Sequence, residues 1–221
     1  MALKYDSSIY EKPSVAVDLL VFTIEDDRLK ILMIKREEAP FKGRIALPGV
    51  FVGMKETLDE AAARGIKEET GLKNIYFEQL YTFGDVKRDP RMRIISVAYM
   101  ALVPISKLDF TAGERTLGAW LFDVEELLQS DKKIAFDHKK IIQCGKERLA
   151  GKVMYSDVAF NFVNEEFTLP ELQKVYEILA GKSLYKANFR KKMADQIEET
   201  DFQMAGQAHR PSRLYRRKVT E

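Results

Sequence analysis

Residues 47–72 of the 221-residue chain, LPGVFVGMKETLDEAAARGIKEETGL, define a loop, a helix and the end of that helix. The run T-L-D-E from Thr57 is a capping box, which predicts that a helix begins at Leu58. Gly71 is typical of the residue that follows a helix end, so we expect the helix to end at Thr70. Any fold of this chain must therefore place a short, well-capped helix directly after an irregular loop.

One face of this helix would suit a metal ion if it carried one more acidic side chain. Glu68 and Glu69 lie three and four residues after position 65, so the three positions share one helical face. Three carboxylates there would supply hard oxygen ligands for Mg2+ bridging phosphate groups. Position 65 is a glycine, and Glu56 in the loop could add one oxygen. The pattern leaves two interpretations open, an enzyme or a descendant of one that no longer catalyses its reaction.

The rest of the first half alternates between strand-like and loop-like segments. Runs rich in Val, Ile, Tyr and Phe are separated by clusters with Gly, Pro or Asp, which predicts four strands. These strands are expected at Val15–Ile24, Lys30–Arg36, Tyr76–Phe83 and Ile94–Val103. A further helix is expected over residues 137–149. This mixed order favours an α+β fold over a doubly wound sheet.

The pattern changes after Gly151. A second capping box begins at Thr168, apolar residues follow at helical spacing, and Gly181 marks the end of that helix. A second helix is expected over residues 185–199, and a short hairpin from Phe202 onward. The inward-facing residues of this second helix would be Phe189, Met193 and Ile197. Helix, turn, basic helix and hairpin is the order of a winged helix-turn-helix.

The length and charge of the chain fit this division. We place two domains at residues 1–150 and 151–221. With 46% hydrophobic and 32% charged residues, the chain has the composition of a globular protein. Residues 182–221 contain ten Lys or Arg and five Asp or Glu, whereas the first 181 residues carry a net charge of −3. The basic C-terminal part favours a polyanionic partner, the alternative being a solvated charged surface.

The compartment is predicted from what the sequence does not contain. The longest apolar run, residues 14–24, is about half of what a bilayer requires and contains Asp18, so it predicts a buried strand. No leader with a basic start and an apolar segment opens the sequence. Cys144 is the only cysteine, which excludes an internal disulfide. We expect a cytoplasmic protein with no membrane partner.

The segment 47–72 resembles the Nudix box, which is a glycine, five residues, Glu, seven residues and then Arg-Glu-apolar-any-Glu-Glu-any-Gly-apolar. The matching positions are Glu56, Arg64, Ile66, Glu68, Glu69, Gly71 and Leu72. Two positions depart from the box: its first glycine is Val50 and its first helical glutamate is Gly65. A β-branched residue is poorly suited to positive φ, so we expect the loop at Val50 to be reshaped.

The second departure bears on chemistry. In hydrolases that carry the box, the glutamate missing at Gly65 belongs to the metal-binding and base machinery, so the resemblance implies weak hydrolysis at best. Weak Mg2+ binding through Glu56, Glu68 and Glu69 is the only cofactor expected, with no organic cofactor. Arg64, which would orient the missing glutamate, is expected to act as a strut.

What remains around the box is a cationic pocket of the kind that grips a pyrophosphate. The expected ligand-binding residues are Arg36, Lys42, Arg64, Arg88, Arg91, Arg93 and His138. Phe41 and Phe136 could stack on a flat ring of the ligand, although packing within the protein is the default role for both. Asp137 is expected to cap the helix that follows it.

Over its whole length the chain resembles the Nudix-related transcriptional regulators, in which a Nudix-like domain is fused to a winged helix-turn-helix. The resemblance is carried by PFKGRIALPG, LYTFGDVKRDPRMRIISVAYMAL, AFDH, FTLPELQKVYEIL, NFRKKM and RPSRLYR. It implies an α/β/α Nudix sandwich with a mixed sheet, followed by a winged helix-turn-helix domain. It also implies a homodimeric repressor that binds double-stranded operator DNA and senses a small metabolite, ADP-ribose or a sugar derivative.

The DNA contacts follow if the second helix of the winged domain enters a major groove. Asn188 and Lys191 would then face base edges. The other expected contacts are Lys186, Arg190, Lys192, Arg210, Arg213, Arg216 and Arg217. The alternative for this part is a helical dimerisation module with a charged rim. The alternative for the whole chain is a Mg2+-dependent Nudix hydrolase of nucleoside diphosphate derivatives such as ADP-ribose.

Overall fold

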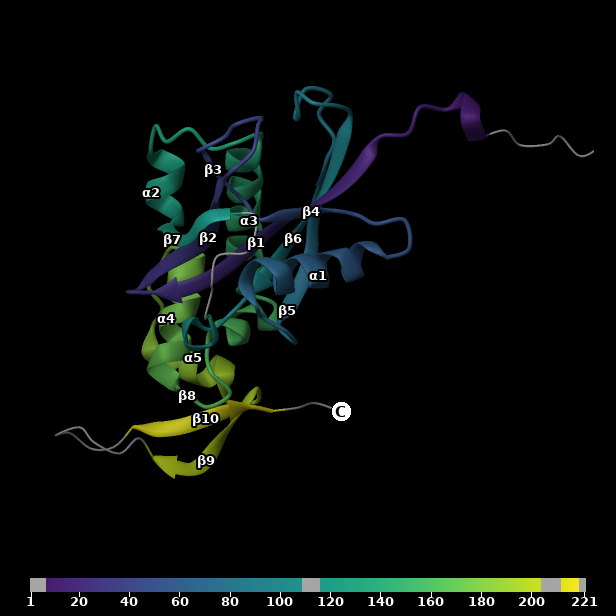
Figure 1. Cartoon of the computed structure of the whole chain (residues 1–221). Coiled ribbons are helices and arrows are strands. Elements are labelled where there is room, and N and C mark those ends of the chain that lie inside the picture. Colours follow the sequence, from purple (N-terminus) through teal and green to yellow (C-terminus); the bar gives the residue numbers. More distant parts are fainter. Residues whose placement is uncertain (1–6, 109–115, 204–211, 219–221) are drawn as a thin grey trace, which may run out of the picture.

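The computed structural model of the chain describes residues 7–108, 116–203 and 212–218. Figure 1 shows two parts that lie against each other, a sheet with helices on both faces and a smaller unit of helices and short strands. The two parts follow each other along the chain, in the order of the sequence patterns. Within the described residues, no helix combines the length and the apolar character needed to span a bilayer.

The larger part is built on a seven-stranded sheet in the order β3-β2-β1-β6-β5, with β4 paired to β1 and β7 paired to β2. The strands are β1 (Ser14–Glu25), β2 (Arg28–Arg36), β3 (Ile45–Ala46), β4 (Gly49–Phe51), β5 (Tyr76–Phe83), β6 (Ile94–Leu102) and β7 (Thr116–Asp123). Strand β1 runs parallel to β6 and antiparallel to β2, so the sheet is mixed, as predicted. The four predicted strands are β1, β2, β5 and β6. The prediction missed β3, β4 and β7.

Helices cover both faces of this sheet. They are α1 (Leu58–Thr70), α2 (Val124–Gln129) and α3 (His138–Lys152), with single turns at η1 (Ser7–Ile9) and η2 (Ile105–Lys107). The odd-numbered side chains of residues 17–21 on β1 pack in a cluster with α1. The even-numbered Leu20 and Phe22 pack in a second cluster with α3, which approaches so closely that a Cβ at Gly145 would lie 2.6 Å from Leu20 Cδ2. The expected α/β/α sandwich is therefore confirmed.

Helix α1 has the bounds that its capping residues predict. The side chain of Thr57 accepts a hydrogen bond from the N–H of Glu60 at 3.2 Å, and the carboxylate of Glu60 accepts one from the N–H of Thr57 at 2.7 Å. Gly71 ends the helix in the left-handed region, with φ of 71°. The capping box and the Gly71 cap each involve residues no more than four positions apart, so the local sequence is sufficient to predict both ends of this helix.

The smaller part is a winged helix. Its elements are η3 (Asp157–Phe162), β8 (Phe167–Thr168), α4 (Leu169–Ala180), α5 (Lys186–Met193), β9 (Ile197–Gln203) and β10 (Arg213–Arg217). The strands form a sheet in the order β8-β10-β9, and β9 and β10 are the wing. The prediction of a second helix over 185–199 is wrong at its end. Residue Ile197 pairs with Arg217 in the wing, so this pairing ends the helical region after Met193.

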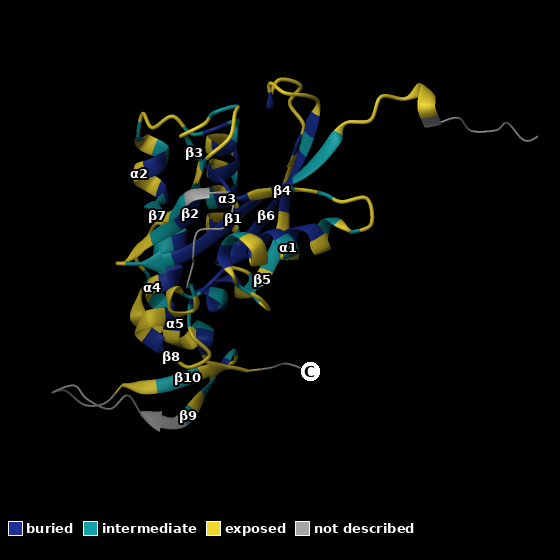
Figure 2. Ribbon diagram, viewed as in Figure 1, coloured by how far each residue is buried: buried dark blue, intermediate teal, exposed yellow. Residues whose placement is uncertain are grey.

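One apolar core joins the two parts of the molecule. Leu149 and Val153 at the end of α3 belong to the same buried cluster as Leu172 and Leu179 of α4. Figure 2 shows buried residues running from the sheet through α3 into α4. On the surface, Lys174 of α4 also forms an ion pair with Asp27 in the turn between β1 and β2, at 3.0 Å. The winged helix is thus seated on the sheet domain through apolar packing.

Candidate ligand pocket and nucleic-acid interface

A cavity of about 750 Å³ opens beside the segment that resembles the Nudix box. We call it the ligand pocket; it lies among β1, β2, β4, α1, the connection between β5 and β6, and the start of α3. Five of the seven expected ligand-binding residues line it, namely Arg36, Arg64, Arg88, Arg91 and His138. Lys42 and Arg93 do not line it. Three acidic residues at its edge, Glu37, Glu38 and Asp89, were not predicted.

The floor of the ligand pocket is a buried network of charged groups. Arg88 donates to Asp18 Oδ2 at 2.8 Å, and to both carboxylate oxygens of Asp137 at 2.8 and 3.1 Å. Ser96 also donates to Asp18, at 2.5 Å. Burial alone would lower the pKa of Arg88, but the two carboxylates outweigh burial and raise it. Arg88 is therefore a fully paired cation that holds together β1, α3 and the connection between β5 and β6.

The network corrects one expectation and explains one omission. The side chain of Asp137 makes no capping hydrogen bond to α3, because both of its oxygens bind Arg88. Asp18 is not among the predicted site residues, although an acidic residue inside an apolar strand is itself a signal for a buried polar site.

His138 lies fully buried next to this network. Its Nδ1 accepts a hydrogen bond from the N–H of Leu47 at 2.8 Å, while its Nε2 is 3.6 Å from Asp18 Oδ1. Burial lowers the pKa of His138, with the charges of Asp18 and Asp137 acting in the opposite direction. A neutral ring fits this geometry, because Nδ1 must remain an acceptor for the Leu47 N–H.

The rim of the ligand pocket combines cations with aromatic rings. The guanidinium of Arg36 lies 4.8 Å from the ring centre of Phe136, and that of Arg91 lies 5.7 Å from the same ring. Phe41 packs edge-on against Phe136 with ring centres 4.9 Å apart. Both phenylalanines have positive φ, 65° and 53°, a conformation that aromatic residues rarely adopt and that is often found at functional sites.

The two rim cations differ in their partners. Arg91 is paired with Asp89 at 2.7 Å. Arg36 donates to two backbone carbonyls, Pro40 at 2.9 Å and Glu38 at 3.4 Å, and pairs with no carboxylate in the described residues. Burial, and then the nearby charge of Arg91, lower the pKa of Arg36. An anionic ligand would supply the counter-charge that this corner of the pocket lacks.

Arg64 occupies the acidic groups that a metal would need. It donates to both oxygens of Glu56, at 2.7 and 3.0 Å, and to Glu68 at 3.2 Å. The Arg64 guanidinium, together with the N–H of Gly53, lowers the pKa of Glu56 to about 2. Arg64 also donates to the carbonyl of Phe51 at 2.9 Å, so it ties α1 to the loop before it. This is the strut that the sequence predicts.

The described residues contain no preformed divalent metal site. They contain no group of three or more His, Cys, Asp or Glu side chains placed to hold an ion. Of the three predicted metal ligands, Glu68 and Glu69 line the pocket and Glu56 does not. Glu68 is paired with Arg64, and Gly65 is buried with no side chain to offer. Val50, the other departure from the box, lies in β4 and is absent from the residues with positive φ. Val50 thus occupies the glycine position of the box in an extended conformation and carries no positive-φ strain.

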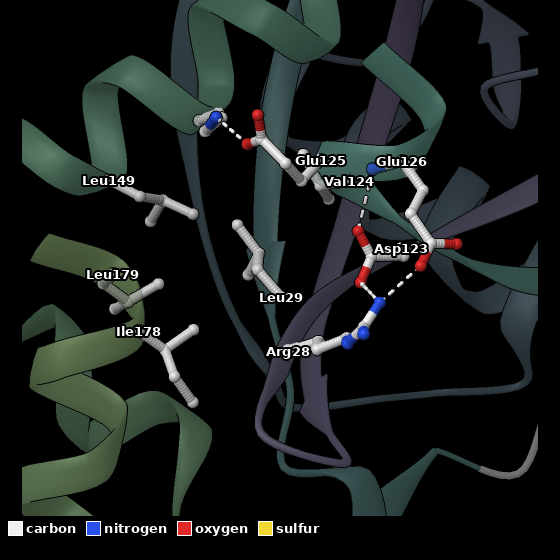
Figure 3. Close-up of a pocket in the computed structure, with 10 residues that line it drawn as sticks. Arg28, Leu29, Asp123, Val124, Glu125, Glu126, Leu149, Ile178 and Leu179 are labelled. Atoms are coloured by element: carbon white, nitrogen blue, oxygen red, sulfur yellow. Dashed lines mark hydrogen bonds and ion pairs between the residues drawn. The ribbon is translucent and has the colours of Figure 1, made fainter. Parts of the chain in front are cut away.

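A second, smaller cavity of about 300 Å³ lies where α4 meets the sheet domain. We call it the seam cavity; Figure 3 shows Leu29, Leu149, Ile178 and Leu179 around it. The charged groups at its edge are paired with one another, Arg28 with Asp123 and Glu126, and Lys146 with Glu125. Because the two cations are already paired with three carboxylates and the interior is apolar, the seam cavity is a packing gap between the two parts rather than an anion site.

Helix α5 presents unpaired polar side chains. Phe189 and Met193 anchor the helix in the core, with Phe189 edge-on to Tyr176 at 5.2 Å. Asn188, Arg190 and Lys191 are exposed and make no hydrogen bond or ion pair with the described residues. Lys186 is exposed on the same helix. Asn188, Arg190 and Lys191 are available to a partner without breaking a contact among the described residues, whereas the charge of Lys186 also acts on Glu177.

The other predicted DNA contacts are engaged within the protein. Lys192 donates to the carbonyl of Met154 at 2.8 Å and lies 4.8 Å from the ring of Tyr176, and burial lowers its pKa. In the wing, three arginines are paired with acidic residues. The pairs are Arg213 with Glu199 at 2.8 Å, Arg216 with Glu198 at 2.5 Å, and Arg217 with Asp157. Arg210 lies outside the described residues.

Two family models match the chain. Residues 12–143 match the NUDIX domain, and residues 159–217 match the NrtR DNA-binding winged helix domain.

Several known proteins are similar to it. The ADPR responsive transcriptional repressor NtrR of Acinetobacter baylyi is 36% identical over 218 residues, which cover 96% of this chain and 85% of that protein. NrtR of Shewanella oneidensis, solved with a 27mer DNA, is 33% identical with a TM-score of 0.81 and covers 92% of this chain and 93% of that one. Its NUDIX domain, solved with ADP ribose, is 31% identical with a TM-score of 0.58 over 66% of this chain and 94% of that one. An ADP-ribose pyrophosphatase of Methanocaldococcus jannaschii is 43% identical over 135 residues, which cover 61% of this chain and 74% of that protein.

Proposed function

The chain belongs to the family in which a NUDIX domain is joined to an NrtR DNA-binding winged helix domain, and from this membership we propose that it is a transcriptional repressor that binds operator DNA and responds to ADP-ribose. One observation carries the proposal: a cationic, aromatic pocket, in which the described residues form no cluster of three metal ligands, belongs to the same molecule as a helix on which Arg190 and Lys191 are free and which packs into the shared core. A receptor for an anionic ligand needs such a pocket, and a DNA-binding protein needs exposed cations of this kind.

In the ligand pocket, we assign the anionic groups of ADP-ribose to the rim. Arg36 and Arg91 would bind the pyrophosphate, because Arg36 lacks a carboxylate partner and Arg91 lies beside it. The exposed ring of Phe51 and the ring of Phe136 line the same cavity and could stack on the adenine. Arg64, Arg88 and His138 would shape the pocket through their internal bonds. Lys42 and Arg93 would act on the ligand at most through their charge.

On the DNA side, we assign α5 to the major groove. Asn188 and Lys191 would contact base edges, with Lys186 and Arg190 at the phosphates. Arg213, Arg216 and Arg217 would reach the flanking backbone only by exchanging their acidic partners for phosphates. A homodimer would impose a palindromic operator with half-sites spaced by whole helical turns. Because it acts on DNA, we place the protein in the cytoplasm.

Ligand binding would release DNA if ADP-ribose binds the free protein more tightly than the DNA-compatible arrangement. We keep the division at residue 150 between a sensing and a reading domain as a proposal. The proposed boundary falls inside the last turn of α3, whose two ends touch the ligand pocket and the winged helix respectively.

A hydrolase of ADP-ribose is the second candidate, favoured by the similarity to the Methanocaldococcus jannaschii enzyme. Weak Mg2+ binding through Glu68 and Glu69 is the most that the box residues would support. One experiment decides between the two functions. The purified chain is incubated with ADP-ribose and Mg2+ while AMP release is measured, and the same samples are tested for a gel shift on the DNA upstream of its own gene. We expect a shift that ADP-ribose reverses, without turnover; rapid AMP release and no shift would establish the enzyme instead.

A further inference from the structure

We propose that Val50 is a steric plug: its two γ-methyl groups fill the space that a side chain at position 65 would need. The absence of a third carboxylate on this helical face then depends on a pair of residues, Val50 and Gly65, and restoring the acid alone would not supply it. This inference rests on the proposed receptor function, because it explains what keeps the pocket from being a metal site.

The first evidence is the contact between the two positions. Gly65 is buried in the middle of α1. A Cβ built on it would lie 3.0 Å from Val50 Cγ2, 3.3 Å from Val50 Cγ1 and 3.0 Å from Leu19 Cδ1. Ordinary contacts of a methyl group to carbon are about 3.5–4.0 Å, so even an alanine here must displace its neighbours. A glutamate must displace them further.

The second evidence is that Val50 has little room to withdraw. It lies in β4, where it pairs with Val17 of β1. The preceding residue, Gly49, is pressed against β1, since a Cβ there would lie 2.8 Å from the carbonyl oxygen of Val17. The backbone that carries Val50 is therefore held close to the sheet. Its side chain lines the ligand pocket directly beside position 65.

The third evidence is the exchange of volumes relative to the box. The box has a glycine where this chain has Val50, and a glutamate where it has Gly65. Relative to the box, this chain has gained a side chain at position 50 and lost one at position 65, so the total side-chain volume near Leu19 stays similar. Restoring the acid alone would therefore overpack this contact. Removal of the Val50 methyl groups relieves two of the three close contacts, so that with Gly65→Glu only Leu19 Cδ1 must shift for a third carboxylate to join Glu68 and Glu69 on the same helical face.

A double-mutant cycle tests the contact itself. The melting temperatures of the wild type, Val50→Ala, Gly65→Ala and the double variant are compared. We expect Gly65→Ala to lower the melting temperature by about 2–4 °C more in the wild-type background than in the Val50→Ala background. Gly151→Ala is the matched control, because Gly151 is also helical but has nothing within 4 Å of its added Cβ. Equal shifts in both backgrounds would overturn the plug.

Manganese binding tests the consequence. Free Mn2+ is measured by electron paramagnetic resonance with Gly65→Glu, with Val50→Ala/Gly65→Glu, and with the control Ala63→Glu, which adds an exposed carboxylate to the same helix. We expect at least tenfold tighter Mn2+ binding in the double variant than in either single one. Binding by Gly65→Glu alone as tight as in the double variant, or none in the double variant, would contradict the proposal. Mn2+ binding with AMP release by the wild type would instead refute the receptor function. The double-mutant cycle of melting temperatures would still test the contact between Val50 and position 65.

Discussion

At the scale of single residues, a substitution of Arg36 distinguishes an effect on ligand binding from an effect on protein stability. Arg36 is the rim cation without a carboxylate partner in the described chain, so we expect Arg36→Gln to weaken ADP-ribose binding with little change in stability. The loss of a charge-assisted contact of about 1.5–3 kcal/mol corresponds to roughly a 10- to 100-fold weaker Kd. Isothermal titration calorimetry measures this change. Lys42→Gln, outside the cavity, should leave the Kd within about twofold; equal losses in both variants would point to a general charge effect.

His138 makes the stability of the protein depend on pH. Its pKa is lowered in the folded state from the ordinary value of 6.5, so below pH 6.5 the unfolded chain binds more protons than the folded one. The stabilisation is therefore complete above pH 6.5 and is lost as the pH falls toward the folded pKa. His138→Asn keeps an acceptor for the Leu47 N–H and removes the titration. Melting curves should show that the wild type loses more stability than this variant between neutral and mildly acidic pH; parallel curves would refute this role.

The composition of the pocket was predictable, but its pairing was not. Five of the seven predicted ligand-binding residues line the cavity, and four of these five are arginines that cluster near the box. The sequence could not predict that Arg88 is bound by Asp18 and Asp137, which are 70 and 49 positions away in sequence. Such partners meet only through the parallel pairing of β1 with β6 and the seating of α3. Residue type predicts the chemistry of a site, whereas the fold decides which charges remain free.

At the scale of elements, local signals determined the accuracy of the predictions. Helices α1 and α4 begin at capping boxes and are followed by left-handed glycines, and both were predicted correctly. Helix α5 has no capping hydrogen bond at Tyr185, and the wing, not the local sequence, sets where the following strand begins. Strands β3 and β4 have two and three residues, too few for any periodicity to be visible.

Helix α5 should carry most of the salt-dependent DNA affinity. Arg190→Ala and Lys191→Ala remove cations that are free in the protein, so each should reduce the salt dependence of the logarithm of the binding constant by about one. Arg216→Ala should reduce it less, because its charge is already paired with Glu198. Fluorescence anisotropy over a range of salt concentrations measures these slopes. A larger effect of Arg216→Ala than of Lys191→Ala would place the wing, and not α5, at the centre of the interface.

At the scale of the whole molecule, the shared core predicts that the two parts unfold together. Leu179 lies in that core and at the seam cavity, so Leu179→Ala enlarges a gap that already exists. We expect a loss of about 2–5 kcal/mol, seen as one transition at a lower temperature in differential scanning calorimetry. Met54→Ala, at a side chain that is 99% exposed, is the control. Two separate transitions, with only the smaller one shifted, would contradict a common core.

The continuity of α3 has a consequence for how such proteins can be recombined. Its first residue, His138, lines the ligand pocket, and Leu149 near its end packs against the winged helix. A chain divided within α3 would therefore leave each part without residues that it packs against. A chimera that contained only the winged helix would expose the apolar residues of α4, because the end of α3 that covers them would be missing. Transfer of this winged helix to another ligand-binding domain would therefore require the whole of α3, together with Asp137, which binds Arg88.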